Sequence, residues 1–218
     1  MEELTDNERE EQLRRWWSDN WLWIFGGIAL GLAALAGWQY WQNQKISASE
    51  AAAAGYRQVI ESLGRDDRPQ AILAAEQLRK AHPEAPYADQ AELALARVAV
   101  ERREYDEAAR LLRGVVDVSR DSDLRMIARE RLARVMIEQG KPDEALALLD
   151  ASQAGAYAAI YHDVRGDALA QKGDTAAARA EFELAISLMQ EDSGLDRRYV
   201  ELKRDALTAP AAPGAVEQ

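Results

Sequence analysis

The sequence predicts an all-α protein: one N-terminal transmembrane helix, then a solenoid of about four helical hairpins plus a capping helix. Its 218 residues are rich in Ala, Leu, Glu, Arg and Gln, which lose little free energy on entering a helix. An uncharged segment near the N-terminus is long enough to cross a bilayer. Beyond it, amphipathic helical segments recur with short polar turns between them, as in a helical solenoid.

The uncharged segment covers residues 20–44. A helix from Trp23 to Trp41 would rise roughly 27 Å, close to the hydrocarbon thickness of a bilayer. All six tryptophans lie at or before Trp41, and they gather at the two ends of the segment, as aromatic rings do at membrane interfaces. We therefore predict a transmembrane helix at 21–44, preceded by an acidic cytoplasmic tail at 1–20.

A cleaved signal peptide is the alternative reading, because residues 34–36 have the small-x-small form of a cleavage site. The tail before the segment is long and carries seven acidic and three basic residues, so an uncleaved anchor is favoured. Orientation follows Lys and Arg. Three arginines precede the span, whereas Lys45 and Arg57 follow it. This small bias places the N-terminus in the cytoplasm.

Two glycines of the span, Gly27 and Gly31, form a GxxxG pattern. Such a pattern lets two helix backbones approach closely in lipid. We predict membrane-helix packing at these glycines. The alternative is that they reflect only the ordinary abundance of Gly in membrane helices.

The body of the chain repeats itself. Small residues expected near the start of each second helix, Ala71, Ala108, Ala145 and Ala178, lie 37, 37 and 33 residues apart. This pattern resembles the tetratricopeptide repeat, a helix–turn–helix unit of about 34 residues. A longer turn or an extra helical turn is expected to accommodate the longer spacing. The predicted domain covers 45–207.

Individual residue types fit this pattern. Gly140 and Gly173 stand where the chain leaves a first helix and favours a left-handed conformation. Gly166 and Phe182 are expected to pack in the seam of the last hairpin. A closing helix is expected from Asp196, and the Ala- and Pro-rich tail at 208–218 should be disordered.

Motifs for chemistry are missing from the sequence. The chain has no cysteine, and its net charge of −11 argues against nucleic-acid binding. His82 and His162 lack metal-ligand spacing and are expected on the surface. No phosphate-binding loop or nucleophile elbow is present. We therefore expect no enzyme activity, cofactor or metal.

A repeat array offers instead a concave surface lined by its first helices. The positions eleven residues before the four alanines are Ile60, Arg97, Arg134 and Asp167. With neighbours one turn away, they give a candidate partner-binding groove for an extended peptide or a helix: Leu93, Arg97, Val100, Ile127, Glu130, Arg134 and Ile137. The alternative is that the arginines cover apolar surface and pair with Glu.

Several motifs together resemble the YfgM family, the ancillary subunits of the bacterial SecYEG translocon. They are Arg-Arg-Trp-Trp at 14–17, Gly-Trp-Gln-Tyr-Trp at 37–41, Leu-Ala-Arg-Val at 132–135, Asp-Val-Arg-Gly-Asp-Ala-Leu at 163–169 and Lys-Gly-Asp at 172–174. The resemblance implies a bacterial inner-membrane protein with a periplasmic repeat domain. It also implies as partners the SecYEG translocon, membrane lipid and a membrane-anchored periplasmic chaperone of the peptidyl-prolyl isomerase type.

The function implied is non-catalytic: members help to pass exported proteins to periplasmic chaperones. The alternative is a membrane-anchored scaffold for assembly of another envelope complex. The sequence leaves the groove's ligand and the oligomeric state open.

Overall fold

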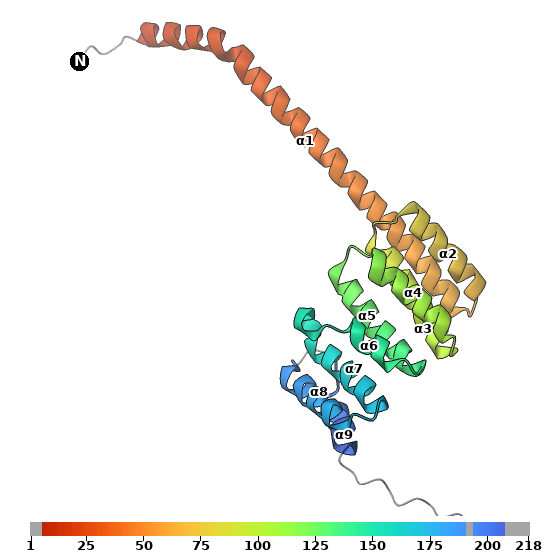
Figure 1. Ribbon diagram of the computed structural model, residues 1–218. Helices are drawn as coiled ribbons and strands as arrows, with labels where there is room; N and C mark the ends of the chain where they lie inside the picture. Colours follow the sequence, from red (N-terminus) through yellow and green to blue (C-terminus); the bar gives the residue numbers. More distant parts are fainter. Residues whose placement is uncertain (1–5, 191–193, 208–218) are drawn as a thin grey trace, which may run out of the picture. The chain divides into compact units, whose positions relative to one another are not determined.

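The computed structural model describes residues 6–190 and 194–207, and every regular element in these ranges is a helix (Figure 1). The predicted all-α fold class is confirmed. The chain divides into two compact units, residues 1–51 and 52–218. Residues 1–5 of the predicted acidic tail and the whole predicted tail at 208–218 lie outside the described residues.

The first helix, α1 (Asp6–Gly64), is longer than expected. We predicted that the transmembrane helix covers 21–44 and that the repeat domain begins at 45, but one helix runs through this boundary. Residues 45–54 contain four consecutive alanines and neither Gly nor Pro, so no residue there stops a helix. The hydropathic pattern changes at this point without any change in backbone conformation.

The part of α1 in the first unit carries a long apolar surface. It contains a segment long and apolar enough to cross a membrane, and none of that segment is buried. At one end, Trp17 and Trp21 each meet Phe25 edge-on. At the other end, the Lys45 ammonium lies 3.6 Å from the centre of the Trp41 ring. A lysine over an aromatic ring at the edge of an apolar segment suits a membrane interface.

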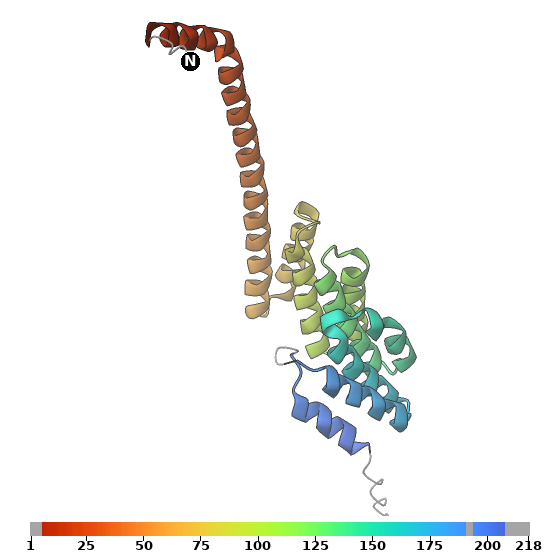
Figure 2. The same cartoon turned by 90° about the vertical axis from the view of Figure 1, so that its left-hand side faces the viewer.

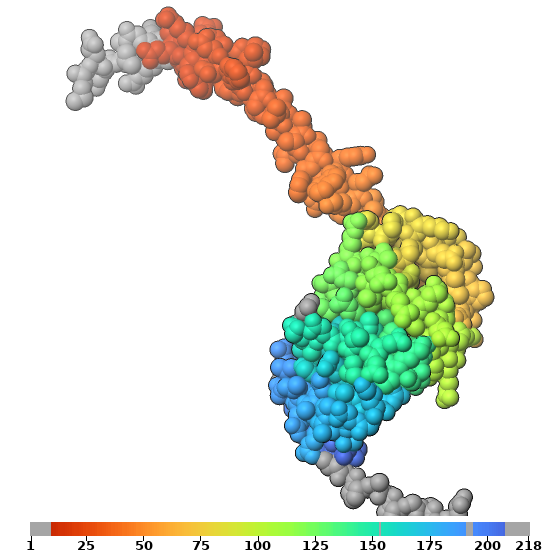
Figure 3. All heavy atoms as spheres, viewed as in Figure 1, coloured from red at the N-terminus to blue at the C-terminus, as the bar shows by residue number. Residues whose placement is uncertain are grey.

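The second unit is a row of helical hairpins. The end of α1 pairs with α2 (Arg68–Ala81), α3 (Pro86–Glu101) with α4 (Tyr105–Val118), α5 (Ser122–Glu138) with α6 (Pro142–Leu148), and α7 (Ala158–Gln171) with α8 (Thr175–Leu188); α9 (Arg197–Ala206) closes the row. Figures 2 and 3 show the hairpins following one another in chain order. Four hairpins and a closing helix match the prediction.

The third hairpin has a shortened second helix. Helix α6 has seven residues, whereas α4 and α8 have 14 each. Two short 3₁₀ helices, η1 (Ala151–Gln153) and η2 (Gly155–Tyr157), lead from α6 to α7. These 3₁₀ helices replace the residues missing from α6, so the smaller spacing of 33 residues between the third and fourth repeats comes mainly from the shorter first helix, α7. The longer spacings elsewhere come from first helices of 16 and 17 residues in α3 and α5, compared with 14 in α7.

Every hairpin turn has the same backbone form. Its middle residue has a positive φ, and its third N–H donates to the carbonyl five residues earlier, as in a Schellman motif. The middle residues are Asp66, Arg103, Gly140 and Gly173, with φ of 58°, 61°, 73° and 83°. The corresponding bonds join Asp67 to Ser62, Glu104 to Ala99, Lys141 to Met136 and Asp174 to Leu169, at 2.8–3.0 Å. The predicted left-handed glycines are confirmed, and two further turns reach the same geometry without Gly.

Replacing Arg103 with glycine should therefore stabilise the protein. A left-handed residue with a Cβ is strained by about 1–2 kcal/mol, part of which is offset by the backbone entropy that Gly loses on folding. We expect Arg103→Gly to raise the free energy of unfolding by about 0.5–1 kcal/mol, measured by urea denaturation of the full-length chain in detergent. The matched change Gly140→Ala should lower it. Equal stability of all three proteins would contradict this account of the turns.

The core consists mainly of small residues where helices cross. Ala71, Ala108, Ala145 and Ala178 are completely buried, as their register predicts. At Gly166, a Cβ would lie 2.5 Å from the Phe182 ring, so only glycine permits this approach of α7 and α8. Polar contacts between hairpins recur at about one repeat length: Arg68 to Glu104, Arg102 to Asp66 and the Tyr161 hydroxyl to the Met126 carbonyl. The first two contacts join neighbouring hairpins at their turns, and the third joins α5 to α7.

Candidate functional site

Two adjoining cavities lie along the first helices of the first three hairpins. The first, of about 660 Å³, is lined by the end of α1, by α3 and by α5. The second, of about 530 Å³, is lined by α3, α4 and α5. Arg97 and Arg131 line both cavities. We call the two cavities together the α3–α5 groove.

The structure brings together most of the predicted groove residues. Leu93 and Ile127 line the first cavity, Val100 and Arg134 line the second, and Arg97 lines both. Leu93 is buried, whereas Val100 is exposed. The other two, Glu130 and Ile137, line neither cavity. Their role in binding, like that of the whole set, stays a prediction.

The two arginines shared by the cavities differ in their pairing. The Arg97 guanidinium lies 3.3 Å from Glu101 one helical turn away, and both side chains are largely exposed. A pair of this kind contributes little and exchanges readily with solvent or a ligand. Arg131 is exposed, and within the described residues it forms no ion pair or hydrogen bond. The sequence prediction took one position from each first helix, eleven residues before the alanine of the second helix. On α5 this position is Arg134, so the prediction missed Arg131.

Arg134, in contrast, is held by carboxylates of its own chain. Its guanidinium pairs with Glu130 and lies 3.2 Å from Asp163 and 3.7 Å from Asp167. Burial would lower the pKa of Arg134, but Glu130 and the two aspartates outweigh it and raise the pKa. The sequence left two alternatives for the groove arginines: binding a partner, or pairing with Glu of the same chain. Arg134 fits the second alternative.

Lys203 of the closing helix completes this network. Its ammonium pairs with Asp163 and lies 2.9 Å from Asp167. Asp163 is only 2% exposed. Burial raises the pKa of Asp167, although Lys203 acts in the opposite direction. The two aspartates lie on α7, whereas Arg134 comes from α5 and Lys203 from α9. The network therefore joins the last two hairpins to the closing helix.

Comparisons with known proteins agree with this architecture. Residues 14–209 match a family model described as a tetratricopeptide repeat-like domain. A protein of Escherichia coli (strain K12) named ancillary SecYEG translocon subunit is 33% identical over 83% of this chain and 87% of its own length. The chain belongs to this family. Proteins of the same name from Haemophilus influenzae and Neisseria gonorrhoeae are 29% and 27% identical, each over 94% of this chain and 98% of its own length.

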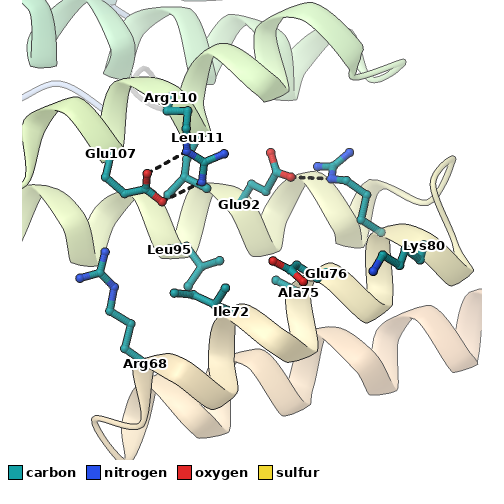
Figure 4. Close-up of a pocket in the computed structure, with 11 residues that line it drawn as sticks. Arg68, Ile72, Ala75, Glu76, Lys80, Glu92, Leu95, Glu107, Arg110 and Leu111 are labelled. Carbon is teal, nitrogen blue, oxygen red and sulfur yellow. Dashed lines mark hydrogen bonds and ion pairs between the residues drawn. The ribbon is translucent and has the colours of Figure 1, made fainter.

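In this member of the ancillary translocon subunit family, a third cavity lies between α2, α3 and α4 (Figure 4). It measures about 220 Å³, and both charged side chains and apolar ones such as Ile72 line it. Glu92 pairs with Arg79, with 2.5 Å between the paired atoms, and Figure 4 shows Glu107 pointing to Arg110. Burial raises the pKa of Glu92 in spite of this arginine. The cavity is small, and its charges are largely engaged with one another.

The two histidines have different surroundings. His82 caps the end of α2 and is partly exposed. His162 was predicted to lie on the surface, but its side chain is only 15% exposed and its Nδ1 lies 2.6 Å from Glu181. The prediction was wrong because α8 covers that face of α7. Burial would raise the pKa of Glu181, but hydrogen bonds with Arg165 and His162 lower it.

Among residues 6–190 and 194–207, no group of three or more His, Cys, Asp or Glu side chains could hold a metal ion. The buried carboxylates of this family member, Asp163 among them, instead face cations of their own chain. The candidate binding surface is the α3–α5 groove, in which apolar side chains adjoin exposed arginines.

Proposed function

We propose that this chain is a non-catalytic inner-membrane protein that associates with the SecYEG translocon and helps to pass exported proteins to periplasmic chaperones. The observation that carries the proposal is the similarity to ancillary SecYEG translocon subunits over most of the chain and of each relative. The exposed apolar segment of α1 supports membrane anchoring. The α3–α5 groove supports binding of a polypeptide, because its exposed arginines adjoin apolar side chains.

The proposed topology puts the N-terminus in the cytoplasm and the repeat domain in the periplasm. The arginines before the apolar segment support this orientation, because Lys and Arg are retained on the cytoplasmic side. The proposed domains are a tail at 1–20, a transmembrane helix at 21–44 and a repeat domain at 45–207. A membrane-anchored chaperone of the peptidyl-prolyl isomerase type is the proposed partner in the periplasm.

The proposed contact with the translocon involves Gly27 and Gly31. A Cβ at either position would meet nothing within 4 Å, so this side of the helix is open to a neighbour in the membrane. Small residues allow such a neighbour to approach closely. At 100° per residue, Ala29 and Ala36 lie on the opposite side of the helix.

Co-purification from detergent-solubilised membranes tests this proposal. We expect the double change Gly27→Leu and Gly31→Leu to reduce the translocon recovered with the full-length chain about tenfold. The matched control, Ala29→Leu with Ala36→Leu, should leave recovery unchanged. Equal recovery with both variants would exclude this helix face as the contact. Absence of the translocon with the unaltered chain would contradict the proposed association itself.

A further inference from the structure

The charges of the α3–α5 groove differ from those of the chain as a whole. The chain carries a net charge of −11, but four arginines and three carboxylates line the groove. Arg102 is bound to Asp66 at 2.6 Å, so this pair is internally neutral. Arg134 faces the carboxylates of α5 and α7 described above. The exposed, weakly held cations that remain are Arg97 and Arg131, and they lie where the two cavities join.

Apolar side chains lie on both sides of this junction. Leu93 and Ile127 line one cavity together with Arg97 and Arg131. In the other cavity, Val100 lies beside the same two arginines. A ligand that spans the junction would therefore meet an apolar wall, a pair of cations and a second apolar wall.

We infer that the α3–α5 groove selects extended polypeptide segments in which a carboxylate is flanked by apolar side chains. The carboxylate pairs with Arg131 and Arg97, since arginine forms two parallel hydrogen bonds to a carboxylate. The flanking side chains cover Val100 on one side and Leu93 with Ile127 on the other. This inference rests on the proposed function, because it assumes that the repeat domain receives polypeptides, and it adds the sequence chemistry of the segment received.

Two features limit where the carboxylate can lie. Glu138 also lines the second cavity and accepts a hydrogen bond from the Tyr105 hydroxyl at 3.5 Å. It lies seven residues after Arg131 on α5, about 10 Å of helix rise away. A ligand carboxylate is therefore repelled from the Glu138 end and drawn to the junction. Beyond Arg134, the Asp163 and Asp167 carboxylates already hold the available cations.

Peptide binding to the full-length chain in lipid nanodiscs tests this inference. The probes are three fluorescent nine-residue peptides with identical apolar residues and a central Asp, Asn or Lys, and empty nanodiscs provide the background. We expect the Asp peptide to bind about tenfold more tightly than the Asn peptide, as a charge-assisted contact to an exposed arginine would give. The Lys peptide should bind more weakly than both. High salt should reduce the preference for Asp.

Charge reversal at the junction provides the decisive comparison. Arg131→Glu should make the Lys peptide bind more tightly than the Asp peptide, and Arg131→Lys should keep the original order. The matched control is Arg113→Glu on α4, because Arg113 is exposed and lines neither cavity. It should leave all three affinities unchanged. Circular dichroism of the variants should match the parent, since Arg131 forms no ion pair or hydrogen bond among the described residues.

Three results would overturn the inference: no binding of any peptide above empty nanodiscs, equal affinities for the three peptides, or the same change in Arg113→Glu as in Arg131→Glu. Failure of the proposed function would look different. In that case the translocon would not co-purify with the unaltered chain, while the preference for the Asp peptide would persist.

Discussion

Replacing Phe182 with alanine is expected to destabilise the repeat unit by about 3–5 kcal/mol, as truncation of a buried aromatic ring typically does. The ring is 1% exposed and lies against Gly166 in the seam between α7 and α8. It also belongs to the core cluster that includes Val200 of the closing helix. Loss of the ring should therefore loosen both the last hairpin and its cap. Urea denaturation of the full-length chain in detergent, followed by circular dichroism, measures the loss.

The partner change, Gly166→Ala, tests the same seam from the opposite side. The added Cβ would lie 2.5 Å from the ring, so we expect a loss of about 1–3 kcal/mol from overpacking. In the Phe182→Ala background the clash disappears, and the same change should cost little. Losses that simply add in the double variant would show that the two residues do not share the seam.

Removing the carboxylate of Asp163 is the second change with a large expected effect. Asp163 is buried and pairs with both Arg134 and Lys203. In Asp163→Ala, Arg134 and Lys203 lose the carboxylate that lies between them. Breaking a buried ion pair in this way typically lowers the free energy of unfolding by about 3–5 kcal/mol. The loss should appear as a lower urea midpoint, with early unfolding of α9.

An exposed ion pair provides the control for this prediction. Arg97→Ala removes the pair with Glu101, which is largely exposed on both sides. It should change the free energy of unfolding by less than about 1 kcal/mol. If Asp163→Ala were equally mild, the network would contribute nothing measurable to holding the closing helix.

The repeat architecture could be predicted because it depends on residues whose size decides local packing. Ala108, Ala145 and Ala178 mark helix crossings where only a small side chain fits, and Gly140 and Gly173 mark turns that favour glycine. The continuity of α1 could not be predicted in the same way. The change in hydropathy near residue 45 indicates where the chain leaves the apolar segment, but it does not indicate where the helix ends. The alanines that follow are good helix formers, so the helix continues. The turns at Asp66 and Arg103 lack the glycine signal, although their hydrogen bonds give the same conformation.

The candidate groove was predictable to the level of a helix face. A register count places one residue of each first helix on the concave side, and this selected Arg97 and Arg134 together. It could not distinguish a loosely held arginine from a firmly held one, because each has a Glu one helical turn away. The aspartates that also hold Arg134 lie about 30 residues further along the chain. It also passed over Arg131, one turn from Arg134 on α5. Only the contacts between helices distinguish the firmly held Arg134 from the exposed Arg97 and Arg131. His162 was misjudged for the same reason, since Glu181 of α8 covers it.

Site-specific photocrosslinking in growing cells tests most directly whether the α3–α5 groove receives exported polypeptides. A photoreactive residue replaces Val100, which is exposed in the groove, or Arg113, which lies outside it. We predict that position 100 crosslinks to newly exported proteins and to a periplasmic chaperone, and that position 113 gives neither adduct. Equal adducts at the two positions, or none at position 100 while export proceeds, would contradict the proposed role of the groove.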